Sequence, residues 1–166
     1  MIVVSDTSGI SGLAIVGYLP LLQQLYEQVF IPPAVANELI RGGSDDPRIT
    51  QALFLDWIEI RQPTDSQLVE TLEIDRNLDR GESEAIVLAL ELGADELLID
   101  ERLGRREARS LGLSITGLLG ILLVAKRRGL VTAIRPIIDD LIDRACFRVS
   151  NPLYAEVLIA AGENST

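Results

Sequence analysis

Four acidic residues of this chain stand where an open α/β fold gathers its functional groups: Asp6, Glu38, Glu82 and Asp100. Asp6 directly follows the apolar run of residues 2–5, and Asp100 directly follows the apolar run of residues 97–99. If both runs are buried parallel strands, their carboxyl ends border one crevice, so the two carboxylates should face each other. Crowded carboxylates repel unless a cation lies between them. The pattern therefore predicts a divalent metal site, and the simplest use of that metal is phosphodiester hydrolysis.

The composition narrows the possible chemistry. A chain of 166 residues, 48% of them hydrophobic, predicts a single domain over residues 1–166 with a sizeable core. It contains no histidine, which excludes a histidine base and histidine-ligated zinc, and one cysteine, Cys146, which we expect to be a small buried hydrophobe. No apolar stretch approaches the roughly 20 residues that span a bilayer, and Met1 leads into a strand-like run rather than a signal segment. We therefore expect a cytoplasmic protein.

The net charge of −10 is unevenly distributed. Residues 101–129 carry seven basic side chains against two acidic ones. This asymmetry can guide an anionic ligand such as RNA to one side of the molecule, with phosphate contacts from Arg102, Arg105, Arg106 and Arg109. The alternative is a pair of solvated helix faces with basic residues near helix C-termini. The sequence leaves both interpretations open.

Along the chain, segments whose apolar residues have strand spacing alternate with segments whose apolar residues have helical spacing. Short apolar or alternating runs predict strands at 2–5, 29–31, 57–61, 96–99 and 113–116. Helical spacing predicts helices at 9–17, 19–27, 33–40, 66–74, 82–92, 102–110, 118–128, 131–144 and 151–161, with a loop over 43–50 followed by another helix start, and a turn over 75–81. This alternation predicts a three-layer α/β/α fold with a central, mainly parallel sheet.

The helix at 82–92 carries two rival acids. Glu82 shares a face with the apolar residues Ala85, Ile86 and Ala89, whereas Glu84 lines up with acidic residues that indicate the solvated side. We therefore prefer Glu82 as the site acid and keep Glu84 as a secondary candidate. The alternative for Glu82 is a helix N-terminal carboxylate favoured by the macrodipole.

The remaining candidates also have structural alternatives. Asp6 and Asp100 are suited to cap the helices that follow them, and Glu38 is suited to a surface ion pair with Arg41. Ser8 and Thr116 each place a hydroxyl at the carboxyl end of a predicted strand, where hydroxyls hold water or phosphate but more often cap helices.

Several segments together resemble the successive motifs of PIN-domain proteins. They are VSDTS (4–8), PPAVANEL (32–39), GESEAI (81–86), LIDE (98–101) and GLSITGLLG (112–120). Their order and content are most similar to the PIN-like branch related to VapC-type toxins of toxin–antitoxin pairs. Two features depart from that branch. The third acid is Glu where many VapC-type toxins have Asp, and IDERLG (99–104) stands in place of a common T-x-D-x-x-F motif, so either Asp100 or Glu101 is the acid that enters the pocket.

The resemblance implies a metal-dependent ribonuclease that uses Mg²⁺ or Mn²⁺. Asp6 would be the central metal ligand, Glu38 the second acid, Glu82 the third acid and a metal ligand, and Asp100 either the fourth acid and a metal ligand or a supporting acid. It also implies a small antitoxin partner that inserts a basic residue among the acids. The alternative is a PIN-like fold that binds a partner without catalysis. A receiver-type signalling domain is disfavoured because it resembles a system that needs a lysine at a strand end, and the only lysine is Lys126, in a predicted helix.

The helices expected at 9–27 are apolar on more than one side. Such helices can supply both core and a partner surface. We therefore expect a homodimer.

Overall fold

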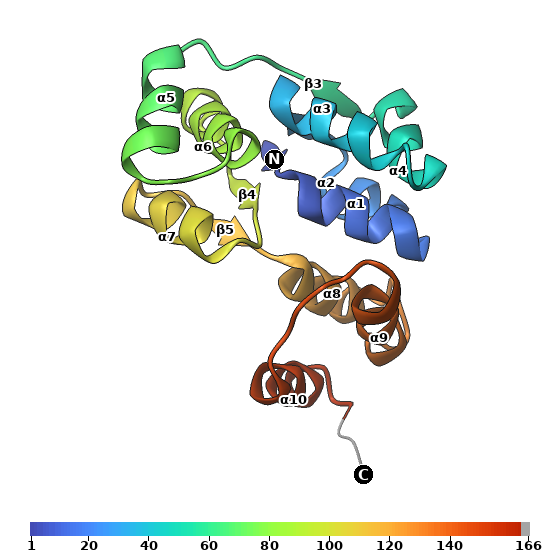
Figure 1. Ribbon diagram of the computed structural model, residues 1–166. Helices are drawn as coiled ribbons and strands as arrows, with labels where there is room; N and C mark the ends of the chain where they lie inside the picture. Colours follow the sequence, from blue (N-terminus) through green and yellow to red (C-terminus); the bar gives the residue numbers. More distant parts are fainter. Residues whose placement is uncertain (164–166) are drawn as a thin grey trace.

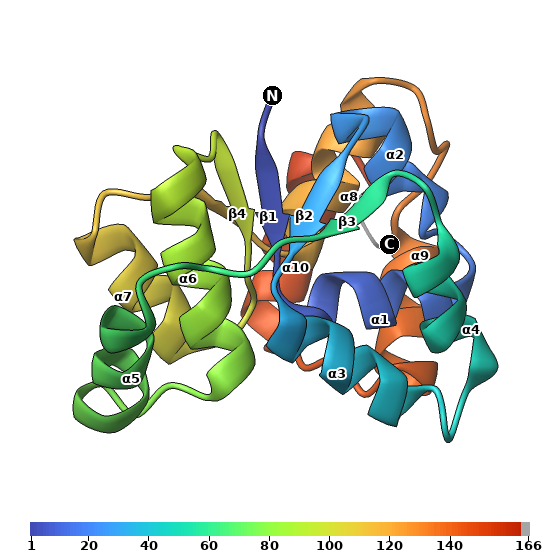
Figure 2. The same ribbon diagram turned by 90° about the horizontal axis from the view of Figure 1, so that it is seen from above.

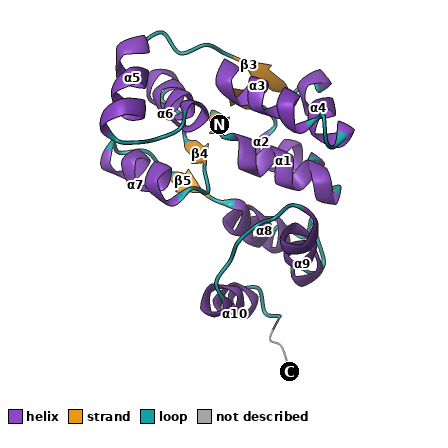
Figure 3. Cartoon of the chain, in the orientation of Figure 1, coloured by secondary structure: helices purple, strands orange, loops and turns teal. Residues whose placement is uncertain are grey.

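The computed structural model describes residues 1–163, and a parallel sheet lies at its centre (Figures 1 and 3). The sheet has five strands in the order β3-β2-β1-β4-β5, and every neighbouring pair is parallel. The strands are β1 (Val3–Ser5), β2 (Val29–Ile31), β3 (Ile58–Ile60), β4 (Glu96–Leu98) and β5 (Ile115–Thr116). All five lie inside the runs predicted from the sequence, each shortened or unchanged.

Helices connect the strands and follow the last one. They are α1 (Thr7–Val16), α2 (Pro20–Tyr26), α3 (Pro33–Gly42), α4 (Pro47–Gln51), α5 (Ser66–Asp75), α6 (Arg80–Leu92), α7 (Arg102–Ser110), α8 (Leu118–Arg127), α9 (Arg135–Arg144) and α10 (Asn151–Ala160), with a 3₁₀ turn η1 (Ala52–Phe54) after α4. Within residues 1–163, none of these helices is both long and apolar enough to cross a bilayer.

The sheet is buried on both faces, which confirms the three-layer prediction. Successive strand residues point to opposite faces. Val3 accordingly belongs to one apolar cluster with residues of α1, α2, α8 and α9, while Val4 belongs to a second with residues of α5, α6 and α7. Figure 2 shows α5, α6 and α7 on one side of the strands, and α2, α8 and α9 on the other. This burial explains why the central strands β1 and β2 are apolar runs, whereas the edge strand β3 alternates.

Three local expectations were wrong. The helix expected at 82–92 begins at Arg80, because Asp79 caps it, so the turn expected over 75–81 is shorter. The helix expected at 131–144 begins at Arg135. A short helix already starts at Pro47, inside the expected loop, because the Asp46 side chain accepts a hydrogen bond from the Arg48 N–H.

The strand order places a topological switch point at the centre of the sheet. The chain builds β1, β2 and β3 toward one edge, then returns to add β4 and β5 on the other side of β1. Ligand sites of open α/β sheets lie beyond the carboxyl ends of the strands at such a point. Asp6 follows β1, and Asp100 follows Ile99 at the end of β4, so both stand at this crevice.

Candidate active site

Asp6 lies at the centre of the crevice and is 3% exposed. Its backbone N–H donates to Leu98 O at 2.9 Å, which ties the end of β1 to β4. Its carboxylate accepts two long hydrogen bonds of 3.4 Å, from the Gly9 N–H in the first turn of α1 and from the Asp100 N–H. Burial, followed by the negative charge of Asp100, raises the pKa of Asp6 to about 8. The site therefore contains a buried carboxyl group whose charge is poorly compensated by the protein.

Asp100 lies beside Asp6 and caps a different helix from the one expected. Both of its carboxylate oxygens accept from the Leu118 N–H at the start of α8, at 3.2 and 3.3 Å, rather than from α7. Burial raises the pKa of Asp100, against the opposing effects of this hydrogen bond and of the positive charge of Arg105. Arg105 itself donates to Ile99 O at 3.2 Å.

Glu82 reaches the crevice from the first turn of α6. Its backbone N–H donates to Asp79 Oδ1 at 2.8 Å, which fixes the start of the helix. Burial of the side chain, followed by the neighbouring Asp79 carboxyl group, raises the pKa of Glu82 to about 9. Glu38, on α3, is half-buried, and its carboxylate accepts a hydrogen bond from the Thr7 hydroxyl. Burial also raises the pKa of Glu38.

Three glycines give these side chains the room they occupy. A Cβ atom on Gly81 would lie 2.5 Å from Glu38 Oε1, and one on Gly104 would lie 2.6 Å from Glu82 Oε2. A Cβ atom on Gly117 would lie 2.6 Å from Asp100 Oδ1 and equally close to Arg105 Nη1. Real Cβ contacts are essentially never this short, so a side chain at any of these glycines would require the acid beside it to move.

The acids border two adjoining cavities. Asp6, Glu38 and Glu82 line a cavity of about 340 Å³, together with Asp79 and Glu101 at its rim; we call it the acid cavity. Asp100 lines a larger neighbour of about 770 Å³. Ser8 and Glu101 line both. Both Asp100 and Glu101 therefore stay candidates, Asp100 at the buried wall next to Asp6 and Glu101 at the exposed boundary between the cavities.

The acids surround the crevice rather than converging on one point. Among residues 1–163, no three acidic, histidine or cysteine side chains lie close enough to hold a single ion. Glu38 accepts from Thr7 and Asp100 accepts from the start of α8, while Glu82 Oε2 lies in the space beside Gly104. Side-chain rotations would be needed to bring three of them onto one cation.

The donor set nevertheless fits a hard divalent cation. All the candidate ligands are carboxylate oxygens, which suit Mg²⁺ and Mn²⁺. The raised pKa values of Asp6 and Glu82 indicate carboxyl groups that retain protons in the folded protein. A cation would replace those protons and relieve the same desolvation and repulsion.

Glu84 does not lie on a solvated face, contrary to expectation. It is 7% exposed, and its carboxylate accepts from the Ala34 N–H at 3.0 Å and from Arg80 Nε at 2.7 Å. The helical phase misled because α6 is buried all round over residues 81–89, between α3, α5 and the sheet. Glu84 therefore caps α3 and is absent from the lining of either cavity.

The hydroxyl candidates differ in their surroundings. Ser8 is half-buried and lines both cavities. Thr116 lines the large cavity, but its hydroxyl donates to Glu96 and so turns away from the acids.

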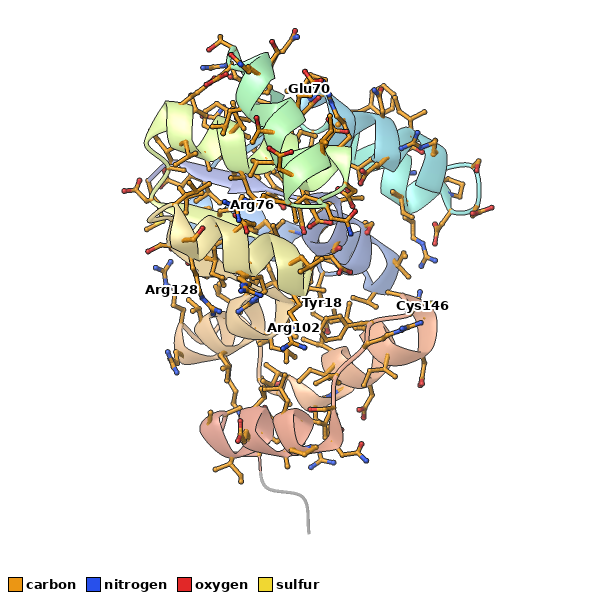
Figure 4. The ribbon with its side chains drawn as sticks, turned by 60° about the vertical axis from the view of Figure 1, so that its left-hand side comes forward. Tyr18, Glu70, Arg76, Arg102, Arg128 and Cys146 are labelled. Carbon is orange, nitrogen blue, oxygen red and sulfur yellow. The ribbon has the colours of Figure 1, made fainter. Side chains whose placement is uncertain are left out.

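The four arginines of α7 share one face of that helix, because their spacings of three and four residues repeat the helical period. Arg105 is half-buried and lines the large cavity, whereas Arg102, Arg106 and Arg109 are exposed. Figure 4 labels Arg102, the first residue of α7. The exposed positions fit solvated helix surface as well as phosphate contact, so both interpretations persist.

Two further expectations were wrong. Cys146 is exposed, in the loop between α9 and α10, and its backbone there has a left-handed φ of 56°. The apolar residues of α1 and α2 are almost all buried in the core, and Ile15 packs against that core from a half-buried position. These helices therefore leave little apolar surface for a partner.

Sequence reasoning missed Asp79, which caps α6 and lines the acid cavity. A signal was present: an N-cap acid followed three residues later by Glu is close to the capping-box pattern. The roles of Gly81, Gly104 and Gly117 carried no such signal, because each glycine meets an acid distant in sequence.

Comparison with known families agrees with this fold. The DUF3368 family model, described as a PIN domain, matches residues 2–163. The chain therefore belongs to the PIN-domain family, whose members are generally nucleases and typically use divalent metals. A comparison with curated proteins found no match.

Proposed function

We propose that this protein is an endoribonuclease that depends on Mg²⁺ or Mn²⁺. The observation that carries the proposal is the buried Asp6 at the switch point of a PIN-domain sheet, with a pKa of about 8. Burying a carboxylate beside another acid costs free energy. Such a group is expected where the active protein binds a cation.

Asp6, Glu82 and Asp100 are the proposed metal ligands, and Glu38 completes the catalytic set. When bound, the metal activates water and offsets charge on the scissile phosphate. Attack in line with the leaving oxygen then requires no histidine. Asp79 acts by positioning, because it fixes the first turn of α6 from which Glu82 projects. Arg102, Arg105, Arg106 and Arg109 would hold flanking phosphates.

We further propose that the protein is the toxin of a toxin–antitoxin pair and acts as a homodimer. Its motifs resemble the VapC-type branch, and the acid cavity suits a basic side chain for the same reason that it suits a metal. An arginine inserted among Asp6, Glu38 and Glu82 would relieve their repulsion and compete with Mn²⁺. The dimer was expected from the apolar helices at 9–27 and loses that support, since α1 and α2 bury their apolar residues; it stays a proposal for sedimentation to test.

The decisive experiment is cleavage of a mixed RNA substrate with and without Mn²⁺. We expect Mn²⁺-dependent internal cleavage, lost in Glu82→Gln and retained in the control Glu70→Gln, which changes an exposed glutamate of α5 (Figure 4). Cleavage that persists in EDTA, or equally in Glu82→Gln, would contradict the proposal.

The second candidate is a PIN fold that binds without cleaving, and the dispersed acids favour it. The same assay separates the two when melting temperature is recorded beside it. A Mn²⁺-dependent rise in melting temperature without RNA cleavage supports the binding module.

The antitoxin proposal has its own test. Neutralising Asp6 and Glu82 together to Asn and Gln should weaken binding of an arginine-bearing antitoxin and remove its competition with Mn²⁺. Unchanged binding would contradict insertion into the acid cavity, and a strict monomer in sedimentation would contradict the dimer.

A further inference from the structure

The larger cavity is a separate structural feature with a different chemistry from the acid cavity. Its volume of about 770 Å³ falls within the roughly 300–1,000 Å³ of small-molecule sites. Its walls come from the start of α1, the end of β5 and start of α8, and the loop and helix at 145–157. We call it the C-terminal cavity.

The position of the C-terminal cavity ties it to the cleavage site. Ser8 and Glu101 line both it and the acid cavity, and Asp100 forms part of its wall. A nucleic-acid strand whose scissile phosphate lies at the acids would therefore place an adjacent nucleotide in this cavity.

The walls of the C-terminal cavity combine polar, basic and aromatic side chains. The hydroxyls of Ser8 and Ser11 and the guanidinium of Arg105 line it beside the acids Asp100 and Glu101. Phe147, Arg148 and Leu153 line it from the C-terminal loop and helix. Single-stranded RNA is recognised by this combination: aromatic faces stack on unpaired bases, arginines bind phosphates, and hydroxyls reach base edges or sugars.

Arg148 is available for such a contact. It is exposed and forms no ion pair with another side chain of residues 1–163. It follows the turn at Cys146, whose left-handed φ of 56° is unusual for a residue other than glycine. The turn brings Cys146, Phe147 and Arg148 to the same cavity wall.

We propose that the C-terminal cavity binds the nucleotide next to the scissile phosphate, with its base stacked on Phe147 and its phosphate between Arg105 and Arg148. This inference rests on the proposed ribonuclease function and adds a specificity site to it. The cavity then determines which base is accepted beside the cut, while the acids carry out the chemistry.

Cys146 provides a probe that does not depend on cleavage, because it is the only cysteine of the chain, is exposed and lines this cavity. The experiment measures the alkylation rate of Cys146 by N-ethylmaleimide in the presence of Mn²⁺ and each of the four ribonucleoside 5′-monophosphates. These ligands contain no phosphodiester and cannot be cleaved. We expect at least one of them to slow alkylation in a saturable manner.

Two variants test the assigned contacts. Phe147→Ala should weaken protection roughly 5- to 150-fold, the range expected for loss of one base–aromatic stack. Arg148→Gln should weaken protection by a monophosphate more than protection by the matching nucleoside. The controls are Phe54→Ala, which removes an aromatic ring that is 84% exposed and lines neither cavity, and Arg127→Gln at the far end of α8.

The two proposals fail separately. RNA cleavage without any nucleotide protection of Cys146, and with an unchanged cleavage pattern in Phe147→Ala, overturns the nucleotide site and leaves the ribonuclease intact. Protection by an antitoxin peptide but by none of the nucleotides also overturns it, in favour of a protein-binding cavity. Nucleotide protection lost in Phe147→Ala supports the site even if the acids prove catalytically silent.

Discussion

The Gly104→Ala substitution tests whether the position of Glu82 matters for metal binding. The new methyl group would lie 2.6 Å from Glu82 Oε2 and 2.7 Å from Ile99 Cδ1. Both atoms end flexible side chains, so the methyl group can be accommodated if Glu82 moves away. Overpacking of this kind costs about 1–3 kcal/mol, whereas replacing glycine by alanine within a helix gains up to about 1 kcal/mol. We expect a net destabilisation between about zero and 3 kcal/mol.

The effect on metal binding should be clearer than the effect on stability. A metal at 100 times its dissociation constant stabilises a protein by about 2.7 kcal/mol. If displacement of Glu82 weakens the metal tenfold, about 1.4 kcal/mol of that stabilisation is lost at the same concentration. For a chain of this size, the Mn²⁺-induced rise in melting temperature should then shrink by roughly 3–6 °C.

The assay is a thermal melt of Gly104→Ala with and without Mn²⁺, beside RNA cleavage. The matched control is Gly42→Ala, at the end of α3, where a Cβ atom would make ordinary contacts of 3.4 Å with Ile49. The control should keep the full metal response and gain slightly in stability. A wild-type metal response and cleavage rate in Gly104→Ala would refute the reasoning that this glycine holds Glu82 in a metal-binding position.

Three further predictions concern the acids. Asp6→Asn should fold normally, melt higher than wild type without metal because repulsion is relieved, and lose the Mn²⁺ response; an unchanged response in thermal melts would contradict a site centred on Asp6. Without metal, Asp6 should make stability decrease as pH rises from about 4 to about 8, since its pKa is raised from 3.8 to about 8 and the folded state therefore holds the proton more tightly. The free energy of unfolding should change by up to about 1.4 kcal/mol per pH unit because of Asp6. Denaturant unfolding of wild type and of Asp6→Asn over this pH range measures that change as the difference between the two proteins. Unfolding free energies that vary with pH in parallel would contradict the prediction. Glu84→Gln should lose the ion pair with Arg80 and cost about 1 kcal/mol while keeping the metal response and cleavage, so loss of cleavage with intact folding would move the site to Glu84.

The strands could be predicted from the sequence because each one depends mainly on residues that are neighbours along the chain. β1 and β2 are short apolar runs that end at a residue unsuited to continue a strand, Asp6 after β1 and Pro32 after β2. Burial on both faces requires such runs, and parallel pairing then sets which ends meet. The placement of Asp6 beside Asp100 followed from these two facts.

The surroundings of the acids depend on tertiary packing and were harder to predict from the sequence. Helical phase places Glu84 outside only if α6 has a solvated side, and α3 covers that side. The C-terminal cavity could not be predicted from the sequence, because its walls come from residues far apart along the chain, around 8, 117 and 147. Asp79, in contrast, carried a local capping signal that could have been recognised.

The capping and functional interpretations of these acids prove compatible. Asp6, Asp79 and Asp100 accept from the first turns of α1, α6 and α8. Glu84 accepts from the first turn of α3. Helix N-termini stabilise nearby negative charge, so the fold directs several of them at its most acidic region.

For Asp6 this stabilisation is incomplete. Its two hydrogen bonds are long, at 3.4 Å, and the pKa is still raised to about 8. The helix N-termini therefore stabilise the acid cluster only in part, and part of its negative charge stays uncompensated. A divalent metal or an inserted arginine would compensate that remaining negative charge. The two are therefore expected to compete for the same carboxylates.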